Sequence, residues 1–315
     1  MAASRCHAAG ARLSQVQPPP ARLALALAAV YLLWGSSYLA TKVMVTDLPP
    51  LVAAGLRFSA AGLLLLAFAW WHAGPPVLER SELRHLGIMG LLSVAFSNAC
   101  NVIAMQHVQS NMSALLNATP SLWIAWLGSM GARGSPLTRT MRAGLAIGLV
   151  GVVFVLSPAR GWDFGALGWQ LLILVACLSW SLGTIYYRHA GSRNPPLMFT
   201  ALMMLTGGLG LLAAAAVAGE SFDPQWTRRG FVAFAWLTVM SSCIAYSAYS
   251  WLAVNTTPAV TGSYGYVNPA IAALLGWIVL AERLSWLQIA GMVVILVGTA
   301  LVTGYWRPLP RRQVV

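Results

Sequence analysis

Long apolar runs alternate with short polar segments along this chain. A helix needs about 20 mostly apolar residues to cross the hydrocarbon core of a bilayer. Ten runs of about this length lie at residues 23–45, 51–71, 86–105, 110–130, 140–157, 165–187, 196–218, 231–254, 258–280 and 286–305. Turn formers such as Pro49-Pro50 and Asn194-Pro195-Pro196 separate them. The pattern predicts an all-α integral membrane protein with ten transmembrane helices.

The composition supports this class, because 58% of the 315 residues are hydrophobic and only 8% are charged. Soluble domains carry roughly 25% charged residues, so this chain has too few charges to cover a water-exposed surface. The net charge of +12 does not indicate nucleic acid as a partner, since the basic residues stand singly between apolar runs. The expected surroundings are a lipid bilayer, with short tails at 1–22 and 306–315.

The arginines indicate how the spans are oriented. With the amino terminus inside, thirteen arginines fall on the inner side: Arg5, Arg12, Arg22, Arg80, Arg84, Arg133, Arg139, Arg142, Arg188, Arg193, Arg307, Arg311 and Arg312. Those on the outer side are Arg160, Arg228, Arg229 and Arg283. Because cytoplasmic loops collect positive charge, both termini are expected in the cytoplasm, in a multi-pass protein of the plasma (inner) membrane.

The chain also contains an internal repeat. A shift of 146 residues places Trp34 on Trp180 and Pro49-Pro50-Leu51 on Pro195-Pro196-Leu197. The two repeats are expected at 23–157 and 158–305. Each holds five spans, an odd number, so the second repeat enters the membrane in the opposite sense. Such inverted repeats are typical of secondary transporters with a site between the halves; the alternative is a membrane scaffold or sensor that transports nothing.

Each repeat contains short characteristic motifs. The first repeat contains Trp34-Gly35-Ser36-Ser37-Tyr38, Lys42, Pro49-Pro50 and Leu56-Arg57-Phe58. The second contains Ser179-Trp180-Ser181, Ser263-Tyr264-Gly265-Tyr266-Val267-Asn268-Pro269 and Ala281-Glu282-Arg283-Leu284-Ser285. Together these segments resemble the EamA family of the drug/metabolite transporter superfamily. The resemblance implies an exporter of small metabolites such as amino acids. The first repeat departs from it, because Arg133 stands where the second repeat has Glu282.

Two basic residues lie within predicted spans. Lys42 is close to the outer end of the first span, and Arg57 lies six residues into the second, roughly 9 Å deep at 1.5 Å per residue. Intramembrane cations face a protein interior or a wet cavity. Either both give the outer half of a cavity a positive potential that attracts a substrate carboxylate, or each binds helix-end carbonyls for purely structural reasons.

Polar and aromatic residues also cluster within spans, where an unpaired amide would be costly against lipid. The candidate substrate-binding residues are Trp34, Tyr38, Lys42, Arg57, Asn101, Asn117, Trp180, Tyr246, Tyr266 and Asn268. Ser37, Asn98 and Tyr264 belong to the same clusters. Pro120 and Pro269 are predicted to bend the fourth span of each repeat, either as hinges beside the cavity or as static kinks.

Enzymatic chemistry is not indicated, and a membrane-embedded enzyme is the least favoured alternative. The histidines are scattered without metal-ligand spacing, and no GxxxxGK[ST] phosphate loop is present. We therefore expect no metal, no cofactor and a small-molecule substrate as partner. All acidic residues fall at span ends or in loops, so no buried carboxylate relay is predicted. Glu282 is either a coupling acid at the rim or a helix cap.

Small residues form a face on the last span of each repeat. Gly144 and Gly148 have GxxxG spacing, and Gly291 and Gly298 share one side of the tenth span. Such faces allow helices to approach closely. The glycines therefore serve packing within the chain or a dimer contact, and both a monomer and a homodimer are compatible with the sequence.

Overall fold

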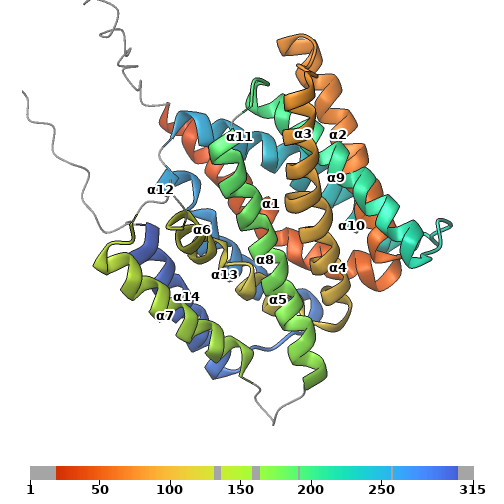
Figure 1. Ribbon diagram of the computed structural model, residues 1–315. Coiled ribbons are helices and arrows are strands. Elements are labelled where there is room, and N and C mark those ends of the chain that lie inside the picture. The colour runs from red at the N-terminus through yellow and green to blue at the C-terminus, as the bar shows by residue number, and fades with distance from the viewer. Residues whose placement is uncertain (1–18, 131–135, 158–163, 191, 257, 304–315) are drawn as a thin grey trace, which may run out of the picture.

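The computed structural model describes residues 19–130, 136–157, 164–190, 192–256 and 258–303, and the regular elements in these ranges are all helical (Figure 1). They are α1 (Pro20–Asp47), α2 (Pro50–Ala73), α3 (Arg80–Met89), η1 (Gly90–Phe96), α4 (Ser97–His107), α5 (Ser110–Leu116), α6 (Pro120–Gly128), α7 (Arg139–Leu156), α8 (Phe164–Ala190), α9 (Pro196–Ala218), α10 (Arg228–Trp236), η2 (Leu237–Ala245), α11 (Tyr246–Asn255), α12 (Pro258–Thr261), α13 (Tyr264–Leu280) and α14 (Trp286–Thr303). The all-α prediction is confirmed.

Eight helical stretches in the described ranges are long and apolar enough to cross a membrane. Two of them are composite: α3, η1 and α4 form one, and α10, η2 and α11 form another, each with a π-helical turn in its middle. The 17-residue helix α13 is shorter but apolar. The count of ten continuous spans is not confirmed, because the segment predicted at 110–130 is divided between α5 and α6.

The division between α5 and α6 has a local cause. Asn117 leaves helical geometry with φ −72° and ψ 2°, and the Thr119 hydroxyl donates to the Leu116 carbonyl at 2.8 Å. Pro120 then begins α6 at its first position, where the missing N–H costs no helical hydrogen bond. The prediction of a proline inside the helix is therefore wrong for Pro120, whereas Pro269 does lie inside α13.

Helices from the two halves of the chain pack in reciprocal pairs. The second span of one half packs along the second of the other (α2 on α9), and the fifth along the fifth (α7 on α14). The first span of each half packs on the fourth of the other, as α1 on α13 and α8 on α6. Figure 1 shows α7 beside α14 at one edge of the bundle and α2 near α9 at another. An approximate two-fold relation between the halves accounts for all four pairings.

Glycines allow the α7–α14 pair to approach closely. A Cβ added to Gly144 would lie 2.7 Å from the Gly298 carbonyl oxygen, and one added to Gly298 would lie 2.6 Å from the Gly144 carbonyl oxygen. Gly151 and Gly291 are related in the same reciprocal way, at 2.8 Å in each direction. Any larger residue would force the two backbones apart. The small-residue face thus serves packing within the chain.

Candidate functional site

A cavity lies between the two halves of the chain, with a volume of about 160 Å³. The first half contributes lining residues from α1, α2, α4 and the α5–α6 junction, and the second half from α8, η2, α11 and α13. They are Trp34, Ser37, Tyr38, Thr41, Arg57, Phe58, Ser97, Asn98, Asn101, Val102, Met105, Asn117, Pro120, Trp180, Ser241, Tyr246, Tyr264 and Asn268. The cavity therefore needs both repeats to exist.

Most of the residues predicted from the sequence meet at this cavity. Those that line it are Trp34, Tyr38, Arg57, Asn101, Asn117, Trp180, Tyr246 and Asn268, with Pro120 beside them. Trp34 and Trp180 occupy equivalent positions of the two repeats, and both face the same space. The aromatic and amide clusters on separate spans thus converge on a single site.

Lys42 and Tyr266 lie outside the cavity lining. The Lys42 ammonium donates to the Met105 carbonyl at 2.6 Å and to the Gln106 carbonyl at 3.1 Å, so it caps the carboxyl end of α4. Tyr266 points toward α14, where its hydroxyl lies 2.7 Å from the Thr303 hydroxyl. For Lys42, the structural alternative matches the geometry: helix-end carbonyls hold the cation. The structure therefore does not bring Lys42 and Tyr266 into this cavity.

Trp34 organises the aromatic wall of the cavity. Its indole N–H donates to the Ser241 carbonyl at 3.2 Å, a carbonyl that belongs to the π-helical segment η2. Its ring lies edge-on to Tyr246 and Tyr264, with centroids 4.9 Å and 5.0 Å away. Such edge-to-face packing fixes ring orientation. The wall is therefore set by residues of both repeats.

Four asparagines supply neutral polar groups. Asn117 donates from Nδ2 to Asn101 Oδ1 at 3.0 Å, and Asn98 donates to the Val94 carbonyl at 2.9 Å. Asn268 is only 3% exposed, and its Oδ1 has no hydrogen-bond partner within the described residues. A buried unsatisfied oxygen is costly unless a ligand or water donates to it. Asn268 Oδ1 can therefore accept a hydrogen bond from a ligand in the cavity.

Arg57 is the charged residue among the described residues that line the cavity. It is 6% exposed, and its Nε donates to Ser242 Oγ at 3.1 Å. The guanidinium carbon lies 4.4 Å from the centroid of the Phe58 ring, a distance typical of a cation–π contact. Unlike Lys42, this cation is not tied to helix-end carbonyls.

Sequence reasoning missed several lining residues, of which Thr41, Phe58 and Ser241 are the most informative. Thr41 follows Trp34 by seven residues and Tyr38 by three, so helical spacing alone would have placed it on their face. Phe58 follows Arg57 directly and was hidden among apolar neighbours. Ser241 lies in η2, where a π-helical turn shifts the register of the helix, and hydrophobic periodicity carries no signal for that shift.

Polar networks join the repeats at each end of the bundle. At one end, Asp47 at the close of α1 accepts from Thr227 and from Arg229, the latter at 2.7 Å to Nε and 2.6 Å to Nη2. We call this the Asp47 network. α2, which is 24 residues long, carries the chain to the other end over roughly 36 Å. There a second network forms around Glu82.

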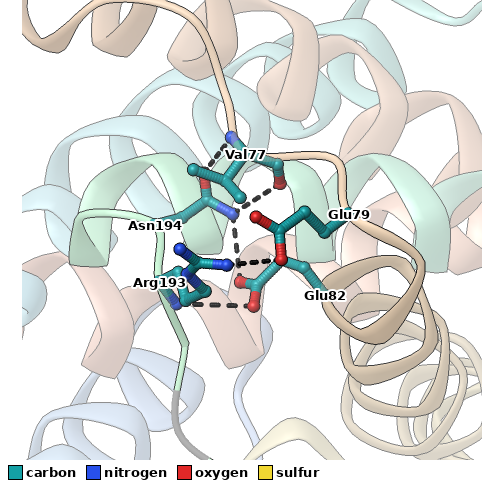
Figure 2. A network of polar contacts seen from close by, with 5 residues as sticks. All are labelled: Val77, Glu79, Glu82, Arg193 and Asn194. Carbon is teal, nitrogen blue, oxygen red and sulfur yellow. Dashed lines mark hydrogen bonds and ion pairs between the residues drawn. The ribbon is translucent and has the colours of Figure 1, made fainter.

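Figure 2 shows the Glu82 network, which ties the start of α3 to the segment before α9. Glu82 accepts from the Ser192 hydroxyl and from Asn194 Nδ2, the latter at 3.0 Å. Asn194 in turn binds the Val77 backbone, accepting at 2.8 Å and donating at 3.0 Å. In the same network, Arg193 forms an ion pair with Glu79 (Figure 2).

Two further carboxylates cap helix amino termini. Glu282 accepts from the Ser110 backbone N–H at 2.7 Å and the Asn111 N–H at 3.0 Å, at the start of α5. Glu220 accepts from the Leu51 N–H at 3.0 Å, at the start of α2. Anionic groups at these positions satisfy free N–H groups and the helix dipole. The geometry of Glu282 is that of a cap, with its carboxylate occupied by α5.

These features define a class of protein. A helical membrane bundle of two reciprocal repeats with a polar and aromatic cavity between them is the architecture of a secondary transporter. The EamA-like transporter family matches this chain over residues 22–157 and 167–304. The chain therefore belongs to the EamA-like transporter family, and is a membrane transporter of the drug/metabolite kind. The resemblance seen in the sequence motifs is confirmed.

Individual relatives cover most of this chain. The uncharacterized inner membrane transporter YedA of Escherichia coli strain K12 is 36% identical over 286 residues, covering 88% of this chain and 89% of YedA. The uncharacterized transporter YvbV of Bacillus subtilis strain 168 is 27% identical over 297 residues, covering 91% and 93%. One crystal structure aligns with a TM-score of 0.65 at 19% identity, over 90% of this chain and 97% of that one, which shows a shared fold.

Proposed function

We propose that the protein is a secondary transporter that moves small metabolites, such as amino acids or related compounds, by alternating access. The observation that carries this proposal is the cavity between the repeats, where Trp34 and Trp180 face the same space from equivalent positions. Two similar halves around one site have two arrangements of comparable energy, each open to a different side. A substrate would bind in the cavity and be released when the halves rock.

The proposal includes a location and a direction. Residues 1–22 and 306–315 would be cytoplasmic tails, with both termini inside, because most arginines then lie on the cytoplasmic side. The plasma (inner) membrane is the proposed site, since YedA is an inner membrane transporter. Export is the proposed direction, following the EamA resemblance of the motifs. The two repeats would occupy 23–157 and 158–305.

Flux from liposomes tests the proposal. The purified chain is reconstituted in liposomes loaded with a mixture of amino acids, organic acids, amines and neutral metabolites, and the compounds that leave are identified by mass spectrometry. We expect selective loss of a few compounds relative to protein-free liposomes. If no compound leaves, with or without a pH gradient or an external counter-substrate, the transporter proposal falls.

A tryptophan pair gives a matched control. Trp180→Ala should lower flux about tenfold, because losing an aromatic wall removes roughly 1.4 kcal/mol or more of contact with the substrate. Trp277→Ala removes the same side chain from α13, where it is 62% exposed outside the cavity lining, and should leave flux unchanged. Equal flux in both variants would exclude Trp180 from the transport site.

A further inference from the structure

Arg57 lacks an acidic partner in the described part of the chain. The ion pairs found there join Arg193 to Glu79 and Arg229 to Asp47, at the ends of the bundle. The described cavity lining contains no aspartate or glutamate. The hydrogen bond of the Arg57 side chain to Ser242 uses Nε. For the terminal nitrogens of this cavity-lining residue, no hydrogen bond or ion pair is found with the described residues.

Burial of an uncompensated charge is costly, by several kcal/mol for one ion. Arg57 is 6% exposed, so the fold retains a guanidinium at a position where an apolar side chain would be more stable. The second repeat shows an apolar side chain at the equivalent position. The 146-residue shift places Arg57 on Met203, which is 6% exposed. The equivalent position thus packs well with an apolar residue, and the charge at Arg57 calls for a functional reason.

We propose that Arg57 selects substrates with a carboxylate, and that the pocket requires no ammonium group on them; this rests on the proposed transport function. A guanidinium presents a planar fork that matches a carboxylate bidentately. Ser242 holds Nε, which leaves the terminal nitrogens for the ligand. An ammonium group would find only neutral partners, because the described lining holds amides, hydroxyls and aromatic rings but no acid.

Asn268 offers the substrate a hydrogen-bond acceptor in the same cavity. Its Oδ1 is buried without a partner in the described residues and lines the same cavity as Arg57. An unpaired amide oxygen accepts a hydrogen bond, so a hydroxyl or an N–H group on the substrate can satisfy it. The chemical class is therefore a small carboxylate, with a hydroxy acid satisfying both Arg57 and Asn268.

A matched set of compounds tests the assignment. The panel pairs 2-hydroxy-4-methylpentanoate, 4-methylpentanoate, leucine and 3-methylbutylamine with the corresponding series built on shorter and aromatic side chains. Binding to the purified full-length chain is measured by calorimetry, and flux is measured in liposomes. We expect carboxylates without an amino group to bind at least as tightly as the amino acids, and the amines to show neither binding nor flux.

Substitutions at the site sharpen this test. Arg57→Gln should weaken carboxylate binding roughly 10- to 100-fold, because it removes a charge-assisted hydrogen-bonded pair. Arg57→Lys should recover part of the affinity, and Ser242→Ala, which keeps the charge, should weaken binding only a few fold. Arg228→Gln is the control, since Arg228 lies at the start of α10 outside the cavity lining. Unfolding temperature and elution volume verify that each variant is folded.

The outcomes separate the two proposals. Transport of an amine, or flux that Arg57→Gln leaves intact, overturns carboxylate selection while transport stands. If carboxylates bind in an Arg57-dependent way but no compound moves, the proposal of carboxylate selection stands and the transport proposal is wrong. An absolute requirement for the amino group contradicts the claim that no ammonium is needed. If no compound of any class binds or moves, both proposals fall.

Discussion

The two ends of the bundle are joined by related but different networks. At each end, the close of the first span of one repeat meets the start of the third span of the other. The 146-residue shift places Asp47 on Arg193, and Glu82 on Arg228, the residue beside Arg229. An acid in one network therefore lies at or next to the position of a base in the other. The two repeats therefore share the place where the first and third spans meet, but they use different side chains there.

The networks also differ in burial. Glu82 is 2% exposed and binds the 192–194 segment through hydrogen bonds. In the Asp47 network, the Asp47 side chain is 4% exposed but that of Arg229 is 70% exposed. Water and salt reach an exposed guanidinium and weaken its attraction to a carboxylate. The Asp47 end should therefore open more readily than the Glu82 end during the proposed transport cycle.

The largest expected effect comes from Glu82→Ala. It removes the acceptor of the Ser192 hydroxyl and the Arg193 N–H, and one acceptor of the Asn194 amide. Asn194 is buried, and an unpaired buried donor is costly. We expect the free energy of unfolding to fall by about 2–4 kcal/mol. Chemical unfolding in detergent micelles measures it. Glu79→Ala is the control, because Glu79 has a more exposed side chain at the same end. If both variants lose the same free energy of unfolding, the burial of Glu82 does not explain its contribution.

A smaller effect is expected from Asp47→Asn at the opposite end. The substitution keeps the size of the side chain and removes the charge that binds Arg229. The loss of unfolding temperature should be smaller than for Glu82→Ala. It should shrink further when salt is raised to roughly 0.5 M, because screening weakens the wild-type pair as well. A loss larger than that of Glu82→Ala, or one unchanged by salt, would reverse the proposed order of the two ends.

Much of the fold could be predicted from the sequence, because apolar length and repeat position are written directly in the residue order. The repeat aligns Trp34 with Trp180 in the sequence, and in the structure both residues line the cavity. The interruption near Asn117 was not predicted, since an apolar run carries no sign that a side chain will end the helix. Pro120 was recognised as important, but its place at a helix start depends on that interruption.

The site could be predicted only in part, for reasons that differ between residues. Lys42 and Arg57 are both intramembrane cations, and sequence cannot tell a carbonyl cap from a cavity charge, because the difference depends on neighbours from other helices. Tyr266 follows the break between α12 and α13, which resets the helical phase, so its face could not be read from span boundaries. Ser241 enters through a π-helical turn. The failures at Tyr266 and Ser241 both concern rotation about a helix axis, whereas the failure at Lys42 concerns the neighbouring helices.

The smallest expected effect concerns the Arg193–Glu79 pair, whose side chains are 65% and 54% exposed. A double-mutant cycle of Arg193→Gln and Glu79→Gln should give a coupling of at most about 1 kcal/mol, as for surface ion pairs in general. Arg193→Gln keeps the backbone N–H that donates to Glu82, so the buried part of the network should survive. Coupling well above this value would mean that the exposed pair, and not buried Glu82, holds this end closed. Both ends would then be held by an ion pair with an exposed arginine side chain. The prediction that the Asp47 end opens more readily than the Glu82 end would then be wrong.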